Sequence, residues 1–364
     1  MKDTSSTLHV VIYRTGGIGD VILSSVALAQ LYQLERPVKI YWISYSPKLE
    51  MITDAYPEVT PIAIEQEIGY KENLKRIFST VEKADLFIDL QRSARSIILC
   101  RIAALKYKAG YFTWQKGSVR RTLMVMRSYF SGRKKFRPAL LINTKPRYQL
   151  MEECVARAVS SIMPFYQKGF PEMPVLTIAS DNLLPTDVDQ WIGICAGALH
   201  QGKWAPAEQF IDILNAVQKN SSARLGVIFL GDAKDNGHSE KIISELQHFS
   251  KIINLCGQRS LTEAASILSQ CTVVLSNDSA LGHLAESVGV DVAMLFGPTV
   301  EAFGFVPFRT GSQAFSGAVG CRPCTKSGYT NCRYGDKLCF TAIDNSKVSN
   351  FLLHKLKVPA LAQA

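Results

Sequence analysis

Three short stretches of the chain place side chains that could bind phosphate or move a proton where a predicted strand gives way to a helix. The first is Thr15-Gly16-Gly17-Ile18-Gly19-Asp20. Glycines let the backbone approach a ligand closely, and a helix N-terminus favours negative charge. Ile22 stands where a dinucleotide fingerprint needs its third glycine, and no P-loop pattern occurs in the chain. The stretch therefore predicts a carboxylate, Asp20, in the first helical turn, either as a reactive group or as a residue that the helix dipole favours.

The second stretch, Ser276 to Ala285, follows an apolar strand and opens a helix. Asp278 is placed to cap this helix, and free backbone N–H groups at Ser279 and Ala280 could hold a phosphate. His283 follows one turn later, where a structural histidine is as compatible with the pattern as a ligand. The next strand ends in Gly297-Pro298-Thr299. This turn lies at the carboxyl edge of the predicted sheet, where open α/β sheets bind ligands.

The third stretch, Ala196 to Pro206, follows the first strand of the second half and contains Gly197 and Lys203. A lysine in a glycine-containing loop before a helix suits a diphosphate. On local grounds a solvent-exposed lysine fits equally well.

The elements that must position these stretches form a regular alternation. Apolar, β-branched runs predict strands, and apolar periodicity of helical spacing predicts helices between them; the strands are expected at 9–13, 39–44, 85–90, 192–195, 225–230, 252–255, 272–276 and 292–296, and the helices at 21–34, 206–219, 239–249, 261–269 and 279–288. Strands and helices at this spacing indicate parallel sheets covered on both faces. The fold class is therefore α/β, with two doubly wound domains at 1–175 and 191–345, a proline-containing linker at 176–190, and a C-terminal helix in 346–364 that packs back on the first domain.

Length and charge narrow the classes of function. The chain has 364 residues, 47% of them hydrophobic and 20% charged, which suits two globular domains and excludes a disordered or fibrous chain. The N-terminus lacks an apolar signal region, which predicts a cytoplasmic protein. The net charge of +10 has one source: 15 basic and no acidic residues lie between Asp89 and Glu152, while the rest carries 26 basic and 31 acidic residues. Such a segment attracts phosphates, nucleic acid or anionic lipid, unless it is merely a solvated face.

The motifs in combination resemble glycosyltransferase family 9, the ADP-heptose:lipopolysaccharide heptosyltransferases. The resemblance is strongest in 253–299, with the helix start at Asp278 and the strand ending Phe-Gly-Pro-Thr, and the opening VIYRTGGIGDVILSSVAL adds to it. Two departures stand out: Ala280 replaces a usual glycine, and Trp204 follows Lys203 directly. The resemblance implies a GT-B fold, in which two Rossmann-like domains face each other across a cleft.

The resemblance also implies roles for single residues in an inverting reaction that needs no metal. Asp20 would be the general base that takes a proton from the acceptor hydroxyl, and Lys203 would stabilise the departing ADP. The implied donor site comprises Gly19, Gly197, Asp235, Arg259, Leu261, Asp278, Ser279, Ala280 and His283. Within it, Asp235 would reach the ribose, and Arg259 and Leu261 would lie near the adenine.

The acceptors of the family give the basic segment a partner, because inner-core lipopolysaccharide is polyanionic. Arg92, Arg95, Arg120 and Arg121 are expected to bind this acceptor. Further basic residues at 133–137 would add attraction to the cytoplasmic face of the inner membrane. Two alternatives stay open: another nucleotide sugar with a glycan or protein acceptor, or a nucleic-acid binder, against which the chain shows no nucleic-acid-binding motif.

Four cysteines lie close together at Cys321, Cys324, Cys332 and Cys339. An opening C-x2-C suits structural zinc or iron, and some protein-glycosylating relatives of the family carry a four-cysteine iron site with wider spacing. Four reduced thiols in a cytoplasmic loop fit the same pattern. The sequence thus leaves a structural metal at these cysteines as one of two expectations, and catalysis itself is expected to need no cofactor.

Overall fold

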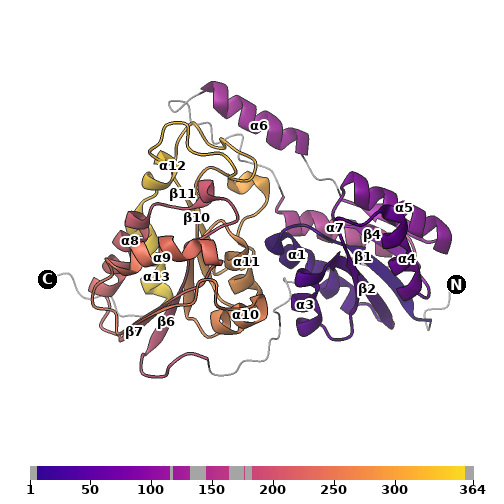
Figure 1. Ribbon diagram of the computed structural model, residues 1–364, viewed down its shortest axis with the longest axis horizontal. Coiled ribbons are helices and arrows are strands. Elements are labelled where there is room, and N and C mark those ends of the chain that lie inside the picture. Colours follow the sequence, from indigo (N-terminus) through magenta and orange to yellow (C-terminus); the bar gives the residue numbers. More distant parts are fainter. Residues whose placement is uncertain (1–5, 115–117, 132–144, 164–175, 177–182, 357–364) are drawn as a thin grey trace. The chain divides into compact units, whose positions relative to one another are not determined.

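The computed structural model describes residues 6–114, 118–131, 145–163, 176 and 183–356. These residues form two compact units, residues 1–116 with 147–176 and residues 117–146 with 177–364. Each unit contains one parallel sheet (Figure 1). The predicted alternation of strands and helices is therefore present in both.

The N-terminal unit has a five-stranded sheet in the order β3-β2-β1-β4-β5. Its elements are β1 (Leu8–Tyr13), α1 (Ile18–Ser24), α2 (Val26–Tyr32), β2 (Val38–Tyr45), α3 (Ser46–Ala55), β3 (Thr60–Ile64), α4 (Tyr70–Thr80), β4 (Leu86–Asp89), α5 (Ala94–Tyr107), β5 (Gly110–Thr113) and α7 (Arg147–Ser160). Helices α1 and α3 lie on one side of the sheet and α4 and α5 on the other (Figure 1). This double covering explains why β1 is a continuous apolar run.

The predicted helix at 21–34 is two helices that meet at Ser25. The Ser24 hydroxyl donates to the carbonyl of Asp20 at 2.7 Å, and the Ser25 hydroxyl donates to that of Ile22 at 2.7 Å. Serine hydroxyls that bond to carbonyls of the preceding turn compete with the helical ladder. The break confines α1 to a short helix with Asp20 in its first turn.

The C-terminal unit has a six-stranded sheet in the order β11-β10-β9-β6-β7-β8. Its elements are β6 (Gln190–Cys195), η2 (Gln201–Lys203), α8 (Ala207–Lys219), β7 (Leu225–Phe229), η3 (Ala233–Asp235), α9 (Asn236–Ile243), β8 (Lys251–Asn254), α10 (Leu261–Ser269), β9 (Val273–Asn277), α11 (Ala280–Ser287), β10 (Val292–Phe296), η4 (Glu301–Phe303), β11 (Gln313–Ser316), α12 (Leu338–Thr341) and α13 (Asn345–Lys355). Helices α8, α9 and α13 cover one face, and α10 and α11 the other (Figure 1). The loops after β6, β9 and β10 leave the sheet at its carboxyl edge.

Two segments belong to a different unit from the one that we expected. Helix α6 (Ser118–Ser131) belongs to the C-terminal unit, where Met124 packs against Val300, Ala302 and Phe303. Helix α13 packs on α8 of the C-terminal unit, and its Leu352 lies in the apolar core to which α8 also contributes. The expectation that the C-terminal helix packs on the N-terminal domain is therefore wrong. Residues 357–364 lie outside the described residues.

Candidate functional site

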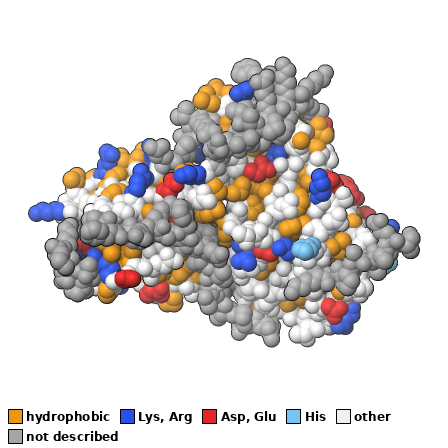
Figure 2. All heavy atoms as spheres, turned by 180° about the vertical axis from the view of Figure 1, so that it is seen from behind, with side chains coloured by type: hydrophobic (Ala, Val, Ile, Leu, Met, Phe, Trp, Pro, Cys, Tyr) orange, Lys and Arg blue, Asp and Glu red, His pale blue; other side chains and the backbone are white. Residues whose placement is uncertain are grey.

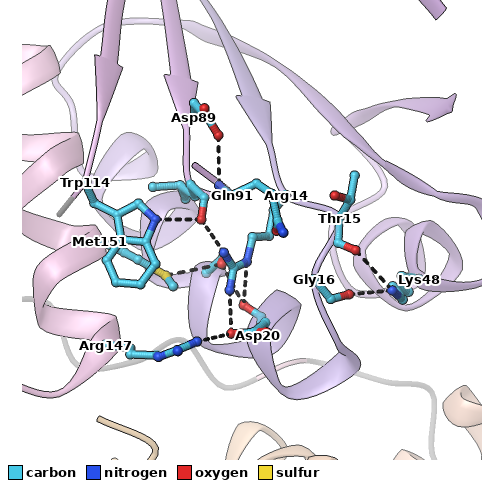
Figure 3. Close-up of polar contacts among 12 residues, drawn as sticks. Arg14, Thr15, Gly16, Asp20, Lys48, Asp89, Gln91, Trp114, Arg147 and Met151 are labelled. Atoms are coloured by element: carbon cyan, nitrogen blue, oxygen red, sulfur yellow. Dashed lines mark hydrogen bonds and ion pairs between the residues drawn. The ribbon is translucent and has the colours of Figure 1, made fainter. Parts of the chain in front are cut away.

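The N-terminal unit surrounds Asp20 with cations. The side chain of Asp20 is 22% exposed, and its Oδ1 lies 2.5 Å from Arg14 Nη2 and 2.6 Å from Arg147 Nη1. Figure 3 shows the two guanidinium groups reaching the carboxylate from different elements, the end of β1 and the start of α7. Both arginines are buried. Charge-assisted bonds of this kind stabilise the ionised form of the carboxylate.

Trp114 and Lys48 complete this arrangement (Figure 3). The Trp114 ring centroid lies 5.9 Å from the Arg14 guanidinium and 5.8 Å from that of Arg147. The ammonium of Lys48 donates to the carbonyls of Thr15 and Gly16 in the glycine turn. Burial lowers the pKa of Lys48, while the charge of Asp20 acts in the opposite direction. Three cations therefore lie near Asp20, and Asp89 is a second carboxylate that acts on the charge of Arg14.

The loop after β4 is held by a buried carboxylate, Asp89. Its Oδ1 accepts the backbone N–H groups of Gln91 at 2.9 Å and Arg92 at 2.8 Å, and its Oδ2 accepts hydroxyls of Ser96 and Tyr111. Burial raises the pKa of Asp89, which these four donors oppose. These donors offset part of the cost of burying the carboxylate and hold the loop after β4 in place.

The arginines predicted to bind the acceptor make contacts within the protein. Arg92 is exposed, and its Nη1 donates to the carbonyl of Trp114 at 3.1 Å. Arg95 donates to carbonyls of residues 65, 66 and 68. The guanidinium of Arg121 lies over the Phe303 ring in the C-terminal unit. The side chain of Arg120 and residues 133–137 lie outside the described residues.

In the C-terminal unit, Lys203 and Asp278 form an ion pair at the carboxyl edge of the sheet. Lys203 Nζ lies 2.7 Å from Asp278 Oδ2, with side-chain exposures of 16% and 5%. The same ammonium donates to the carbonyl of Asp278 at 3.2 Å, and the Thr299 hydroxyl donates to Asp278 Oδ2 at 2.7 Å. Two of the predicted stretches, 196–206 and 276–285, thus meet here with the turn at 297–299, whose Thr299 we had not assigned to the site.

Helix α11 begins beside this pair. Ser279 is its N-cap, and the Ser279 hydroxyl accepts from the Gly282 N–H at 3.3 Å. Gly282 has to be glycine, since a Cβ there would come within 2.9 Å of both Met294 and Ser276. Buried His283 faces Glu286 through Nδ1 at 3.3 Å, and its buried Nε2 has no partner among the described residues. Ala280, the first helical residue, leaves its backbone N–H at the helix start.

Asp235 lies under Gly197 at the neighbouring strand end. A Cβ on Gly197 would come within 2.1 Å of the Asp235 carboxylate, so only glycine allows this approach. Asp235 Oδ2 accepts the N–H of Asp232 at 2.8 Å, and its Oδ1 is buried without a partner among the described residues. Burial raises the pKa of Asp235. Arg259 is exposed and Leu261, at the start of α10, is half-buried, in the loop that follows β8.

The four cysteines do not form the predicted metal site. Among the described residues, which include all four, no group of three or more His, Cys, Asp or Glu side chains is arranged to hold a metal ion. Cys339 belongs to the apolar core of the unit and Cys321 packs against it. Burial, followed by the neighbouring cysteines, raises the pKa of Cys324 to about 11 and that of Cys339 to about 12. The expectation of a structural metal at these cysteines is not supported.

Comparison with known proteins identifies the class. Residues 75–334 match the model of glycosyltransferase family 9 (heptosyltransferase), so the chain belongs to this family. The fold agrees: a family 9 glycosyltransferase from Veillonella parvula has a TM-score of 0.69 at 15% identity over 96% of this chain and 97% of that one. The ADP-heptose lps heptosyltransferase II of E. coli has a TM-score of 0.64 at 17% identity, over 96% and 98%. These neighbours confirm the predicted α/β GT-B fold class.

At the sequence level, lipooligosaccharide heptosyltransferase 2 of Haemophilus influenzae is 34% identical over 114 residues. The match spans 30% of this chain and 31% of that protein, about a third of the curated relative's length. The family and the fold are therefore established.

Proposed function

We propose that this chain transfers heptose from ADP-heptose to an anionic acceptor of the lipopolysaccharide inner core, with inversion at the anomeric carbon and without a catalytic metal. The observation that carries the proposal is the Lys203–Asp278–Thr299 arrangement at the start of α11, in a chain of the heptosyltransferase family. Lys203 and the amides of the helix start supply the positive charge that a departing diphosphate requires.

In this reaction the acceptor hydroxyl loses its proton to Asp20 as its oxygen bonds to the anomeric carbon. The bond from that carbon to the diphosphate oxygen breaks, and ADP leaves as an anion. Asp20 Oδ1 accepts a guanidinium contact from each of Arg14 and Arg147, and we propose that the acceptor hydroxyl approaches the same carboxylate. Gly16 has no side chain to obstruct the carboxylate, because a Cβ on it would be 2.8 Å from Oδ2. General-base catalysis of this kind contributes roughly 10²–10⁴-fold to a rate.

The donor would extend from α11 toward Asp235. The buried Oδ1 of Asp235 has no partner among the described residues. We propose that it accepts hydrogen bonds from two adjacent hydroxyl groups, such as those of a ribose. Gly197, Arg259 and Leu261 would complete the nucleoside site, and Ser279, Ala280 and His283 the diphosphate site. Gly19 lies in α1 beside Asp20 and would let substrate approach the backbone there.

The acceptor's negative charge suits the cations around Asp20. Because Arg92 and Arg95 already donate to backbone carbonyls, Lys48 and Arg147 join them as candidates for the acceptor's acidic groups. A cytoplasmic location at the inner membrane is part of the proposal. No helix among the described residues is long and apolar enough to span a bilayer.

The outer face of α5 is a candidate for contact with the membrane surface, because Ile98, Ile102 and Leu105 there are 43%, 42% and 79% exposed. These three residues, with Arg101 between them, are called the α5 face. On the other side of the molecule, seen from behind in Figure 2, hydrophobic and basic side chains also lie next to one another. Such a mixture suits the interface of an anionic bilayer.

Calorimetric titration with ADP, GDP and UDP, followed by turnover of ADP-heptose with deacylated lipopolysaccharide, tests the proposal. We expect preferred ADP binding that Lys203→Ala weakens, and turnover that Asp20→Ala abolishes. A preference for UDP or GDP would mean that the donor is another nucleotide sugar. Turnover only onto a glycan or a protein would mean that the acceptor is not lipopolysaccharide. Absence of any nucleotide binding would refute the proposal.

A further inference from the structure

The segment Cys321–Cys339, called here the cysteine-rich segment, lies against both loops that hold the Lys203–Asp278 pair. Its first contact is made by Arg322, whose side chain is 2% exposed. Arg322 Nε donates to the carbonyl of Gly297 at 2.6 Å, Nη2 to that of Thr299 at 2.9 Å, and Nη1 to that of Gly317 at 2.9 Å. One buried guanidinium therefore fixes the backbone on both sides of Pro298.

This turn carries the hydroxyl that orients Asp278. The backbone N–H of Cys324 donates to the carbonyl of Pro298 at 3.1 Å, a further bond from the segment to the turn. Thr299 in turn donates to Asp278 Oδ2, the atom that Lys203 contacts. A chain of bonds therefore runs from Arg322 to the Lys203 ammonium, all within the C-terminal unit.

The far part of the segment holds the Lys203 loop itself. Lys337 Nζ donates to the carbonyl of Trp204 at 2.8 Å and lies 3.4 Å from that of Gln201. A Cβ on Gly202 would lie 2.3 Å from the carbonyl oxygen of Gly328, and a Cβ on Gly328 would lie 2.4 Å from Lys203 Cγ. The segment thus lies directly against the lysine's own backbone and side chain.

We propose that the cysteine-rich segment positions Lys203, with Arg322 and Lys337 as positioning residues for the group that meets the diphosphate. The inference rests on the proposed function for the identity of the ligand, but the positioning itself is a property of the free protein. The family match assigns no role to the residues of this segment. The positioning role needs no metal. An ammonium displaced by about 1 Å can lower a rate on the order of 100-fold.

The test reads the environment of Lys203 without any substrate. Variants Arg322→Lys, Thr299→Val and Lys337→Met are labelled with an amine-modifying reagent, and modification of Lys203 is measured by mass spectrometry against exposed Lys219 in the same sample. We expect Lys203 to react several-fold faster in all three variants, because its ammonium loses its fixed partner or its fixed loop. Thr299→Val removes one hydroxyl from a site of unchanged shape, so it covers the case in which Arg322→Lys fails to fold.

The matched control is Arg309→Lys, which changes an arginine paired with Asp291 at the other end of β10. It should leave Lys203 labelling unchanged. Labelling of Lys203 at the parent rate in folded Thr299→Val and Lys337→Met would overturn the inference. ADP titration of the same variants separates the two proposals: a parent chain that binds no ADP refutes the proposed function, while the labelling result still decides the positioning role.

Turnover of ADP-heptose gives a second readout when Thr299→Val and Lys203→Met are combined in one double variant. If Thr299 acts through Lys203, Thr299→Val should lower kcat by about 10- to 100-fold in the parent and have little further effect when Lys203 is already methionine. Independent effects of the two changes would contradict action through the lysine. A change in the acceptor's KM alone would contradict it as well.

Discussion

The two units hold their candidate reactive groups in different ion pairs. In the N-terminal unit, Asp20 is one carboxylate shared by two buried guanidinium groups, those of Arg14 and Arg147, with Lys48 near by. In the C-terminal unit, Lys203 is one ammonium paired with one carboxylate, that of Asp278.

We propose that this difference matches the two substrates. Two guanidinium groups around a single carboxylate suit a polyanionic acceptor. A neutral pair at a helix start can exchange the carboxylate for an incoming diphosphate without a permanent surplus of charge. Arginine also stays protonated at every usable pH, whereas an ammonium is a compact charge that can change partner more readily.

The largest expected effects come from substituting the two candidate reactive residues themselves. Asp20→Asn keeps the shape but removes the base, and kcat should fall by roughly 10²–10⁴-fold while ADP affinity stays as in the parent. Lys203→Met should weaken ADP binding as well as turnover. Steady-state kinetics and calorimetry measure both. Equal loss of ADP affinity in the two variants would show that the division of roles between the units is wrong.

The second effect is on stability. Arg14→Met removes a buried guanidinium that bonds to Asp20 and to the Leu90 carbonyl, and the free energy of unfolding should fall by about 3 kcal/mol. Arg147 still pairs with Asp20, which keeps the loss at the lower end for a broken buried pair. Urea denaturation measures it. Lys203→Met, at the more exposed pair, serves as the comparison, and a loss as large as that in Arg14→Met would contradict the difference between the two regions.

The third prediction compares two buried carboxylates, one in each unit. Asp89 has four donors, whereas Asp235 Oδ1 has no partner among the described residues. Asp89→Asn should therefore cost about 1–3 kcal/mol through donors left without an acceptor. Asp235→Asn should raise stability at neutral pH, by about 1.4 kcal/mol for each unit by which burial raises the pKa.

The pH dependence of this stability difference follows from the linkage between proton binding and folding. Because the pKa of Asp235 is raised in the folded protein, the folded state binds the proton more tightly than the unfolded one. The cost of the charged form is present above the folded pKa and disappears as the pH falls toward the unfolded value of about 3.9. The advantage of Asp235→Asn should shrink over that interval in denaturation curves. An advantage that is independent of pH would rule out desolvation as its cause.

Local patterns indicated the three loops that meet in the C-terminal unit, whereas the roles of their residues remain predictions. Lys203, Asp278 and Thr299 come from three loops that follow strands, and parallel strands bring such loops to one edge of the sheet. Alternating apolar runs and turns were sufficient to indicate these loops. The sequence could not show that Lys203 and Asp278 pair with each other.

The N-terminal partners were harder to predict. Arg14 directly follows the apolar strand β1 and precedes the glycine turn, a local signal that sequence analysis could have used. Arg147 lies 127 residues from Asp20 and had no such signal, since its role depends on how α7 packs beside α1. The placement of α6 in the C-terminal unit depends likewise on contacts between distant residues, such as Met124 and Phe303.

The smallest expected effect concerns the α5 face, through which we propose that the N-terminal unit contacts the membrane. Leu105→Asp should weaken binding to phosphatidylglycerol vesicles by about 1 kcal/mol or more, because it removes buried apolar area and adds an anion. Sedimentation with vesicles measures the affinity, and phosphatidylcholine vesicles show the part that depends on lipid charge. Leu183→Asp, at an exposed leucine of the C-terminal unit, is the matched control. If both variants weakened binding equally, the membrane contact would not distinguish the units, and the ion pairs of Asp20 and Lys203 alone would separate them.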